Sequence, residues 1–383
     1  MRSSFVKGGC HLARRRKVSE TSPTFAVLGA GHGGLAMAGH LALMGFRTNL
    51  WNRSKERVEH IVDRGGVDLE GVVEGFGKLD VATDDIKEAI EDADVIMVVV
   101  PATGHRDVAR QCAPYLRREQ TVVLNPGRTF GALEFMQVLK EARLRERPTV
   151  AEAQTFIYVS RHTDFARARI MQIKNSVPLA AIPAHRTPDV LALVRQAFPQ
   201  FVAATNVLET GLDNIGAIFH PTLTLLNAAR IESTHGDFEY YLEGVSPFTA
   251  RVLEAADAER VAIGTALGVH LHTAREWLYL AYSSAGKTLY EAIQATPGYK
   301  GVRAPSTLTH RYILEDVPMS LVPMVSVSRQ LGVETPTLCS LIHIASLIHA
   351  CDFWKTGRTV DKLGMAGLSV KEIRMLALEG VVR

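Results

Sequence analysis

One histidine in the second half of the chain stands where acid–base chemistry is possible. His220 directly precedes Pro221, and proline suits the first turn of a helix because its missing N–H has no partner there anyway. We therefore predict that His220 lies at a helix N-terminus, where the helix dipole lowers the pKa of the imidazole and keeps it neutral. A neutral imidazole can accept a proton near pH 7, as a general base must.

A second segment, RYILEDVP at residues 311–318, carries an arginine and a carboxylate five residues apart. Asp316 is flanked by apolar residues, and such a carboxylate can orient a histidine and stabilise its charged form. Arg311 offers a planar fork that matches a carboxylate. The residue types alone also allow a structural His220, and they allow Arg311 to pair with Glu315 or Asp316 as support.

A glycine-rich turn near the start of the chain has the form of a dinucleotide-binding loop. It reads GAGHGG at residues 29–34, follows an apolar strand at 25–28 and precedes a helical pattern. In such a loop Gly29 permits the tight turn, Gly31 lets the backbone approach a pyrophosphate, and Gly34 lets the helix pack close to the strand. The helix N-terminus then presents free N–H groups to the phosphates.

The end of the second strand indicates which cofactor binds. An acid there would bond the ribose of NAD, but the chain has Asn52, Arg53 and Ser54. A guanidinium and a hydroxyl suit a 2′-phosphate, so we predict NADP in preference to NAD. The predicted cofactor site comprises Gly29, Gly31, His32, Gly33, Gly34, Asn52, Arg53, Ser54, Pro101 and Asn125.

Apolar strands alternate with helices through the first half of the chain. This order predicts an α/β domain with a Rossmann-type, doubly wound parallel sheet. Predicted strands cover 25–28, 48–51, 94–100, 121–124 and 201–204, and predicted helices cover 35–44, 55–64 and 84–93.

Helical spacing dominates the second half, which predicts an all-α C-terminal domain. The chain divides on this basis into a disordered basic tail (1–23), a dinucleotide-binding domain (24–205) and a helical substrate and catalytic domain (206–383). Predicted helices cover 208–219, 222–232, 250–267, 275–282, 321–331 and 337–353.

The composition of the 383 residues is that of an ordinary globular protein, with 47% hydrophobic residues and a net charge of +3. That charge is too small to indicate nucleic-acid binding, and no apolar run is long enough to span a membrane. We expect a cytoplasmic protein with free thiols and no metal site, since neither the four cysteines nor His343 and His349 have metal-ligand spacing.

The chain resembles the opine dehydrogenases, the octopine/nopaline dehydrogenase family, and is most similar to the bacterial type that makes N-(1-carboxyethyl)norvaline-like products. The resemblance runs from Phe25 to about Leu376. The stretches that carry it are VLGAGHGG, VVVPA, LNPG with GALEF, HPTLTLLNAARIE, YYLEG, RYILEDVP with LVP, and FWKTGRT before LGMAGLS.

The resemblance implies an NAD(P)-dependent oxidoreductase that acts on a CH–NH group. Such an enzyme condenses an amino acid with a 2-oxo acid, through an imine, to an N-(carboxyalkyl)amino acid. By this resemblance His220 is the catalytic acid–base group, Asp316 its partner, and Arg311 the residue that binds the oxo acid. Thr155 would contact the amino substrate, although the local sequence EAQT departs from the family's Glu-Thr pairing. Many relatives carry Asp where this chain has Asn52.

Two other function classes are also considered, a ketone reductase that shares the two-domain plan and a non-catalytic protein with a Rossmann domain. A ketone reductase like ketopantoate reductase or glycerol-3-phosphate dehydrogenase would use a lysine as its acid, but Lys174, Lys287 and Lys300 lie in no motif typical of either. A non-catalytic cofactor-sensing protein would have no need of His220 and Asp316. Among partners we expect only small molecules, with a homodimer possible.

Overall fold

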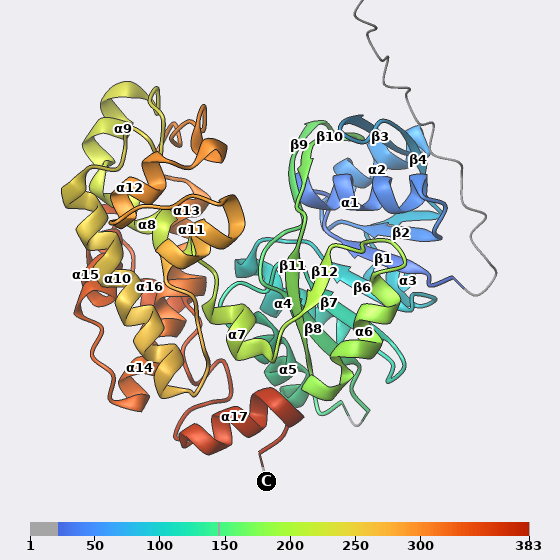
Figure 1. Ribbon diagram of the computed structural model, residues 1–383. Helices are drawn as coiled ribbons and strands as arrows, with labels where there is room; N and C mark the ends of the chain where they lie inside the picture. Colours follow the sequence, from blue (N-terminus) through green and yellow to red (C-terminus); the bar gives the residue numbers. More distant parts are fainter. Residues whose placement is uncertain (1–21, 145, 383) are drawn as a thin grey trace, which may run out of the picture.

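An eight-stranded sheet forms the centre of the first half of the molecule (Figure 1). In spatial order its strands are β12 (Phe201–Ala203), β11 (Val177–Ile182), β8 (Thr149–Ala153), β7 (Thr121–Leu124), β6 (Val95–Val98), β1 (Phe25–Leu28), β2 (Thr48–Trp51) and β5 (Val81–Thr83). The computed structural model describes residues 22–144 and 146–382. Most of the tail predicted for residues 1–23, including its basic run, therefore lies outside the described residues.

Helices pack on both faces of this sheet, which confirms the doubly wound α/β prediction. Successive side chains of each strand enter two different hydrophobic cores, one on each face. One core contains α1 (His32–Leu43) and α6 (Thr187–Val194), and the other contains α3 (Ile86–Ile90), α4 (His105–Cys112) and α5 (Gly131–Glu141); α2 (Lys55–Arg64) packs near the edge strand β5.

The prediction of a purely parallel sheet was wrong at one pair. β8 and β11 are antiparallel, while the other neighbours in the sheet are parallel. The reason lies in the connection between them. The chain leaves β8 through a hairpin of two further strands, β9 (Tyr158–Asp164) and β10 (Arg167–Ile173), and no crossover helix turns it back into a parallel strand.

The two hairpin strands belong to a second sheet that the sequence did not predict. Its order is β4 (Gly75–Lys78), β3 (Gly66–Gly71), β10, β9. This sheet covers the outer side of α1 (Figure 1), which explains why α1 is buried on most of its sides. The approach is close: a Cβ at Gly77 would lie 2.1 Å from the carbonyl oxygen of Gly39 on α1.

The second half is helical, as predicted. Beyond β12, the described residues contain one isolated β-bridge, between Glu239 and Arg303. The helices are α7 (Val207–Leu212), α8 (Gly216–Leu226), α9 (Ala228–Thr234), α10 (Pro247–Ala266), α11 (Ala274–Tyr282), α12 (Leu289–Gln294), α13 (Arg311–Leu314), α14 (Val322–Leu331), α15 (Pro336–Ile348), α16 (Phe353–Thr356) and α17 (Val370–Glu379), with a π-helical turn at Val317–Leu321.

The predicted helix 208–219 is in fact two helices, α7 and α8, separated at residues 213–215. Buried Arg260 of α10 donates to the carbonyl oxygen of Leu212 at 3.0 Å and lies 3.4 Å from the Asp213 carboxylate. These contacts hold the chain in a non-helical turn, and this turn places Asn214 and Ile215 at the start of α8.

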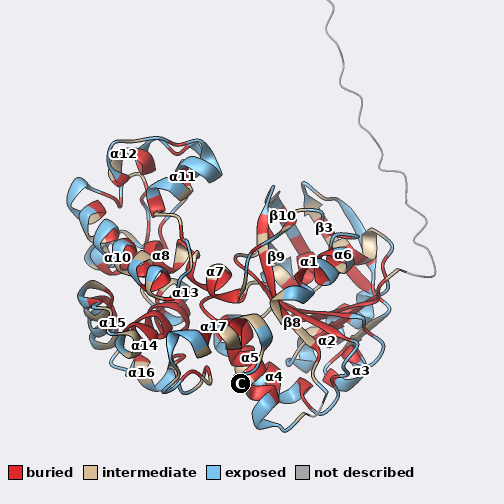
Figure 2. Cartoon of the chain, turned by 60° about the horizontal axis from the view of Figure 1, so that its bottom comes forward, coloured by how far each residue is buried: buried red, intermediate tan, exposed pale blue. Residues whose placement is uncertain are grey.

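The C-terminal part of the chain contributes to the contacts between the two halves. The last helix, α17, returns to pack against β11 and α7 beneath the first half (Figures 1 and 2). Arg358, in the segment after α16, is fully buried; it pairs with Glu134 of α5 at 2.7 Å and donates to the carbonyl oxygens of Gly127 and Thr129. Arg358 thus fixes the loop after β7 against the helical half.

No described helix has the length and apolar character needed to cross a membrane.

Candidate active site

Two cavities adjoin at the carboxyl ends of the central strands. One, of about 400 Å³, is lined by the glycine loop and by the ends of β2 and β6. The other, of about 560 Å³, is lined by residues of both halves of the molecule, among them Thr155, His220 and Arg311. His32, the first residue of α1, lines both cavities. We call them the nucleotide pocket and the substrate cavity.

The glycines of the loop have distinct geometric roles. Gly29 has φ +115°, and a Cβ there would lie 2.5 Å from the carbonyl oxygen of Val99. A Cβ at Gly34 would lie 1.6 Å from the carbonyl oxygen of Gly29, so a side chain would force α1 away from β1. A Cβ at Gly31 would meet no atom within 4 Å. The backbone at Gly31 therefore borders open space, where a pyrophosphate can approach.

The structure brings most of the predicted cofactor residues to one place. Gly29, Gly31, His32, Asn52, Arg53 and Pro101 line the nucleotide pocket. Gly33 lines the substrate cavity instead, next to the ring of Phe156. Ser54 and Asn125 line neither cavity: Ser54 precedes α2, and Asn125 is buried before a cis peptide bond to Pro126.

The end of β2 is braced by two contacts to Ala30 in the glycine loop. Asn52 Oδ1 accepts from its N–H at 3.1 Å, and Arg57 donates to its carbonyl oxygen at 2.8 Å. Arg57 also lines the nucleotide pocket, so this pocket has two guanidinium groups, those of Arg53 and Arg57. Arg57 was not among the predicted cofactor residues, because it lies on α2, the helix after the strand.

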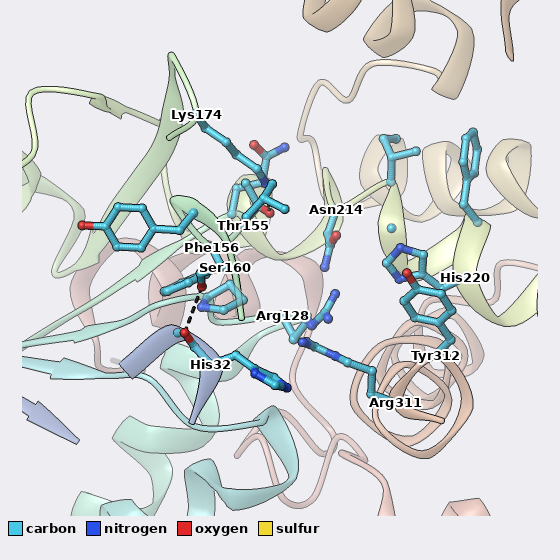
Figure 3. Close-up of a pocket in the computed structure, with 18 of the residues that line it drawn as sticks. His32, Arg128, Thr155, Phe156, Ser160, Lys174, Asn214, His220, Arg311 and Tyr312 are labelled. Carbon is cyan, nitrogen blue, oxygen red and sulfur yellow. Dashed lines mark hydrogen bonds between the residues drawn. The ribbon is translucent and has the colours of Figure 1, made fainter. Parts of the chain in front are cut away.

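In the substrate cavity, His220 and Asp316 meet as predicted. His220 Nδ1 lies 2.8 Å from Asp316 Oδ2, although 96 residues separate them. The Asp316 side chain is fully buried, and the His220 side chain is 19% exposed. The Tyr312 ring stacks on the imidazole at a centroid distance of 4.0 Å (Figure 3). Since Asp316 occupies Nδ1, Nε2 is the nitrogen left for a substrate.

His220 does not lie at a helix N-terminus, and that prediction was wrong. It is the fifth residue of α8, and Pro221 stands inside the helix. The helix begins a turn earlier than predicted, and Pro221 forgoes one backbone hydrogen bond. The pKa of His220 is nevertheless lowered, because burial disfavours the charged ring; Asp316 opposes this shift, and Arg128 and Arg311 reinforce it.

Arg128 is a central residue of the site that the sequence did not reveal. It follows the LNPG segment with φ +57° and lines the substrate cavity. Its guanidinium is 3.1 Å from Asp316 Oδ1 and 3.4 Å from Glu315 Oε1. Burial alone would raise the pKa of Glu315, but the guanidinium groups of Arg128 and Arg311 hold it at about 2. Glu315 is therefore charged in the folded protein.

Arg311 lies beside Arg128 at the mouth of the cavity (Figure 3). Its guanidinium pairs with Glu315 Oε2 at 2.8 Å, and its side chain is 55% exposed. The supporting ion pair considered from the sequence is thus present. A single contact leaves part of the five-donor fork for a ligand, so the pairing with Glu315 also aims the guanidinium.

Thr155 and Lys174 meet on the opposite side of the substrate cavity from His220 (Figure 3). Lys174 Nζ donates to Thr155 Oγ1 at 2.6 Å. Burial, with a smaller contribution from Arg128, lowers the pKa of Lys174 to about 8. Glu152, three residues before Thr155, is fully buried and accepts from Thr210 and from the Ala132 N–H, so it supports the backbone and does not line the cavity.

Aromatic rings from the helical half form one wall of the substrate cavity. Tyr241 and Tyr299 stack at a centroid distance of 3.9 Å, and Trp277 meets Tyr282 edge to face at 5.6 Å. Such a wall excludes water and lowers the local dielectric, which strengthens the charge interactions around His220.

Family models match the two halves separately. The model for the alpha-helical domain of NAD/NADP octopine/nopaline dehydrogenases matches residues 203–349. The N-terminal model of NAD-dependent glycerol-3-phosphate dehydrogenase matches residues 24–148. The nucleotide-binding half therefore matches the model of another dehydrogenase family, and the helical half matches that of the octopine/nopaline dehydrogenases.

Comparison with individual proteins points to the same family as the model that matches the helical half. An opine dehydrogenase of Arthrobacter sp. (strain 1C) is 40% identical over 92% of this chain and 98% of its own. Octopine dehydrogenase, solved in complex with NADH and agmatine, shares the fold with a TM-score of 0.79 at 20% identity, over 94% of this chain and 99% of its own. Yersinopine dehydrogenase with NADP⁺ bound has a TM-score of 0.73 at 18% identity, over 90% of this chain and 93% of its own. This chain is an NAD(P)-dependent oxidoreductase and belongs to the opine dehydrogenase family.

Proposed function

We propose that this enzyme condenses the amine of an amino acid with a 2-oxo acid and reduces the resulting imine, with NADPH as the preferred cofactor. The observation that carries the proposal is the meeting of the His220–Asp316 pair and Arg311 in one cavity, which adjoins the nucleotide pocket through His32. In this division of labour, residues 24–205 hold the cofactor, and the chain from residue 206 supplies the acid–base pair.

The proposed chemistry requires a base near the amine, because a protonated amine cannot attack a carbonyl carbon. His220 Nε2 accepts the proton, and Asp316 stabilises the imidazolium that results. The amine nitrogen then bonds to the carbonyl carbon of the oxo acid, and the carbinolamine loses water with a proton returned by His220. The cofactor supplies the hydride that reduces the imine carbon.

Arg311 holds the carboxylate of the oxo acid in this scheme. A guanidinium fork fixes the plane of a carboxylate as well as its position, and the adjacent cavity places the keto carbon near His220. Holding both substrates together replaces a bimolecular encounter by an intramolecular step. Arg128 has a positioning role, since it fixes the second oxygen of Asp316 at 3.1 Å.

The preference for NADPH rests on the nucleotide pocket. Arg53 and Arg57 line it, and no acidic side chain follows β2 directly, where the sequence has Asn52. A 2′-phosphate gains from guanidinium groups and meets no carboxylate there. Among the residues proposed to hold the cofactor, the loop glycines and the α1 N-terminus would receive the pyrophosphate.

The proposal is tested by a matrix of amino acids against pyruvate, 2-oxoglutarate and glyoxylate, with NADPH consumption and the coupled product both measured. Turnover that needs both substrates supports the opine reaction. Reduction of an oxo acid alone at the same rate would instead indicate a simple ketone reductase.

A further inference from the structure

The substrate cavity carries more positive charge than its own carboxylates neutralise. Its lining includes the basic side chains of Arg128, Arg161, Lys174 and Arg311. Glu315 and Asp316 lie against Arg128, and Glu315 also pairs with Arg311. The one acid in the lining, Asp213, is paired with buried Arg260.

Lys174 is the partly buried cation that remains without a carboxylate. Within residues 22–144 and 146–382, no carboxylate oxygen lies within ion-pair distance of the Lys174 ammonium group. The ammonium group donates instead to the neutral hydroxyl of Thr155. Its backbone N–H donates to the Ile157 carbonyl oxygen at 2.9 Å, so the residue is anchored. Burying an ammonium group without a counter-charge is unfavourable unless a ligand supplies one.

Another side chain in the same cavity has a donor group without an acceptor. Asn214, which lines the cavity between Thr155 and His220 in Figure 3, is buried, and its side-chain nitrogen has no hydrogen-bond partner among the described residues. Buried donors are normally satisfied. The cavity between Lys174 and His220 therefore offers donors to a ligand that bears acceptor oxygens.

We propose that Lys174, supported by Thr155, binds the α-carboxylate of the amino-acid substrate. The inference rests on the proposed function, which requires two carboxylates in this cavity. Arg311 binds the carboxylate of the oxo acid beside His220, and Lys174 binds the carboxylate of the amino acid on the facing side of the cavity. The amino nitrogen then lies between the two walls, within the part of the cavity that His220 faces (Figure 3).

The charge balance agrees with this assignment. Arg128, Arg311 and Lys174 against Glu315 and Asp316 leave one positive charge, and exposed Arg161 adds a second. Two bound carboxylates would neutralise these two positive charges. A lysine of pKa about 8 is mostly charged near neutral pH, and an adjacent carboxylate would keep it so.

The test crosses enzyme variants with substrates that lack one functional group. Lys174→Met is compared with wild type on the best amino acid from the matrix and on the amine that lacks its α-carboxylate. The amine serves as substrate or, where it is not turned over, as a competitive inhibitor against the amino acid. We expect the amino-acid KM to rise at least tenfold, while amine binding and the oxo-acid KM change less than twofold.

Two further variants keep the result interpretable. Lys174→Arg retains the charge, so its KM for the amino acid should lie close to the wild-type value. This comparison holds even if Lys174→Met is less stable. Lys78→Met removes an exposed lysine of β4 that does not line the substrate cavity, and it should match wild type.

An equal loss for the amine and the amino acid would overturn the proposal, as would a rise in the oxo-acid KM alone or a fall in kcat with the amino-acid KM unchanged. Failure of the proposed function is distinguishable, because it appears in wild type as turnover without any amino acid.

Discussion

The nucleotide pocket and the substrate cavity lie side by side but are built on different physical principles. The pocket is lined by the glycine loop and by the segments that follow β2 and β6, and in the loop Gly29, Gly31 and Gly34 leave space that a side chain would fill. The cavity is formed by charged side chains from distant parts of the chain, whose charges depend on one another. Replacing one side chain should change one contact in the pocket but several in the cavity.

The largest effect is expected for His220→Ala, which removes the only group proposed to move protons. General acid–base catalysis contributes roughly 10²–10⁴-fold, so kcat should fall by about that factor while the fold persists. Steady-state kinetics with both substrates measures it, and His343→Ala, an exposed histidine of α15, is the matched control. Full activity of the His220 variant would exclude this residue as the base.

Asp316→Asn should reduce kcat by roughly 100-fold, because a hydrogen bond to a charged group contributes about 1.5–3 kcal/mol. It should also move the pH profile in a defined direction. Asp316 raises the pKa of His220, while burial, Arg128 and Arg311 lower it. Without the carboxylate the imidazolium loses a proton more readily, so the acidic limb of kcat/KM should move to lower pH. A shift to higher pH would contradict the account.

Arg311→Lys should act mainly on the oxo acid. The charge remains but the fork is lost, so binding of the oxo acid should weaken by about 1.5–3 kcal/mol, seen as a higher KM for that substrate. A purely supporting Arg311 would behave differently: the substitution would lower the melting temperature through the lost pairing with Glu315 and leave the KM unchanged.

The smallest effect should come from the nucleotide pocket. Asn52→Asp places a carboxylate where a 2′-phosphate would bind, and each ~1.4 kcal/mol of repulsion changes the affinity ratio tenfold. We expect a shift of about tenfold toward NADH, measured as the ratio of kcat/KM for the two cofactors. Tighter binding of NADH than NADPH by wild type would show that the NADPH preference is wrong.

The same physical difference explains what the sequence could predict. The glycine loop is contiguous, so its residues and their spacing stand in one line of sequence. Arg128 and Glu315 are 187 residues apart, and nothing near Arg128 in the sequence marks it as a partner. The pairing of His220 with Asp316 was predicted through the family resemblance. A neutral imidazole was predicted because His220 was expected at a helix N-terminus, but in the structure it is burial that lowers the pKa of His220.

The second sheet was missed for a related reason. β3 and β4 contain glycines at residues 66, 71, 75 and 77, which are unfavourable in strands, and β3 pairs with β10 almost a hundred residues later in the sequence. Only the tertiary packing on α1, where Gly39 and Gly77 approach closely, selects this conformation.

The proposed division of the substrate cavity assigns each of its two sides to a different substrate of one reaction. Its most direct test is NADPH consumption by the wild-type enzyme with an oxo acid alone, an amino acid alone, and both together, with the product identified by mass. The account predicts substantial consumption only with both, and one coupled secondary amine formed per NADPH oxidised. Equal consumption with the oxo acid alone, yielding a hydroxy acid, would contradict it.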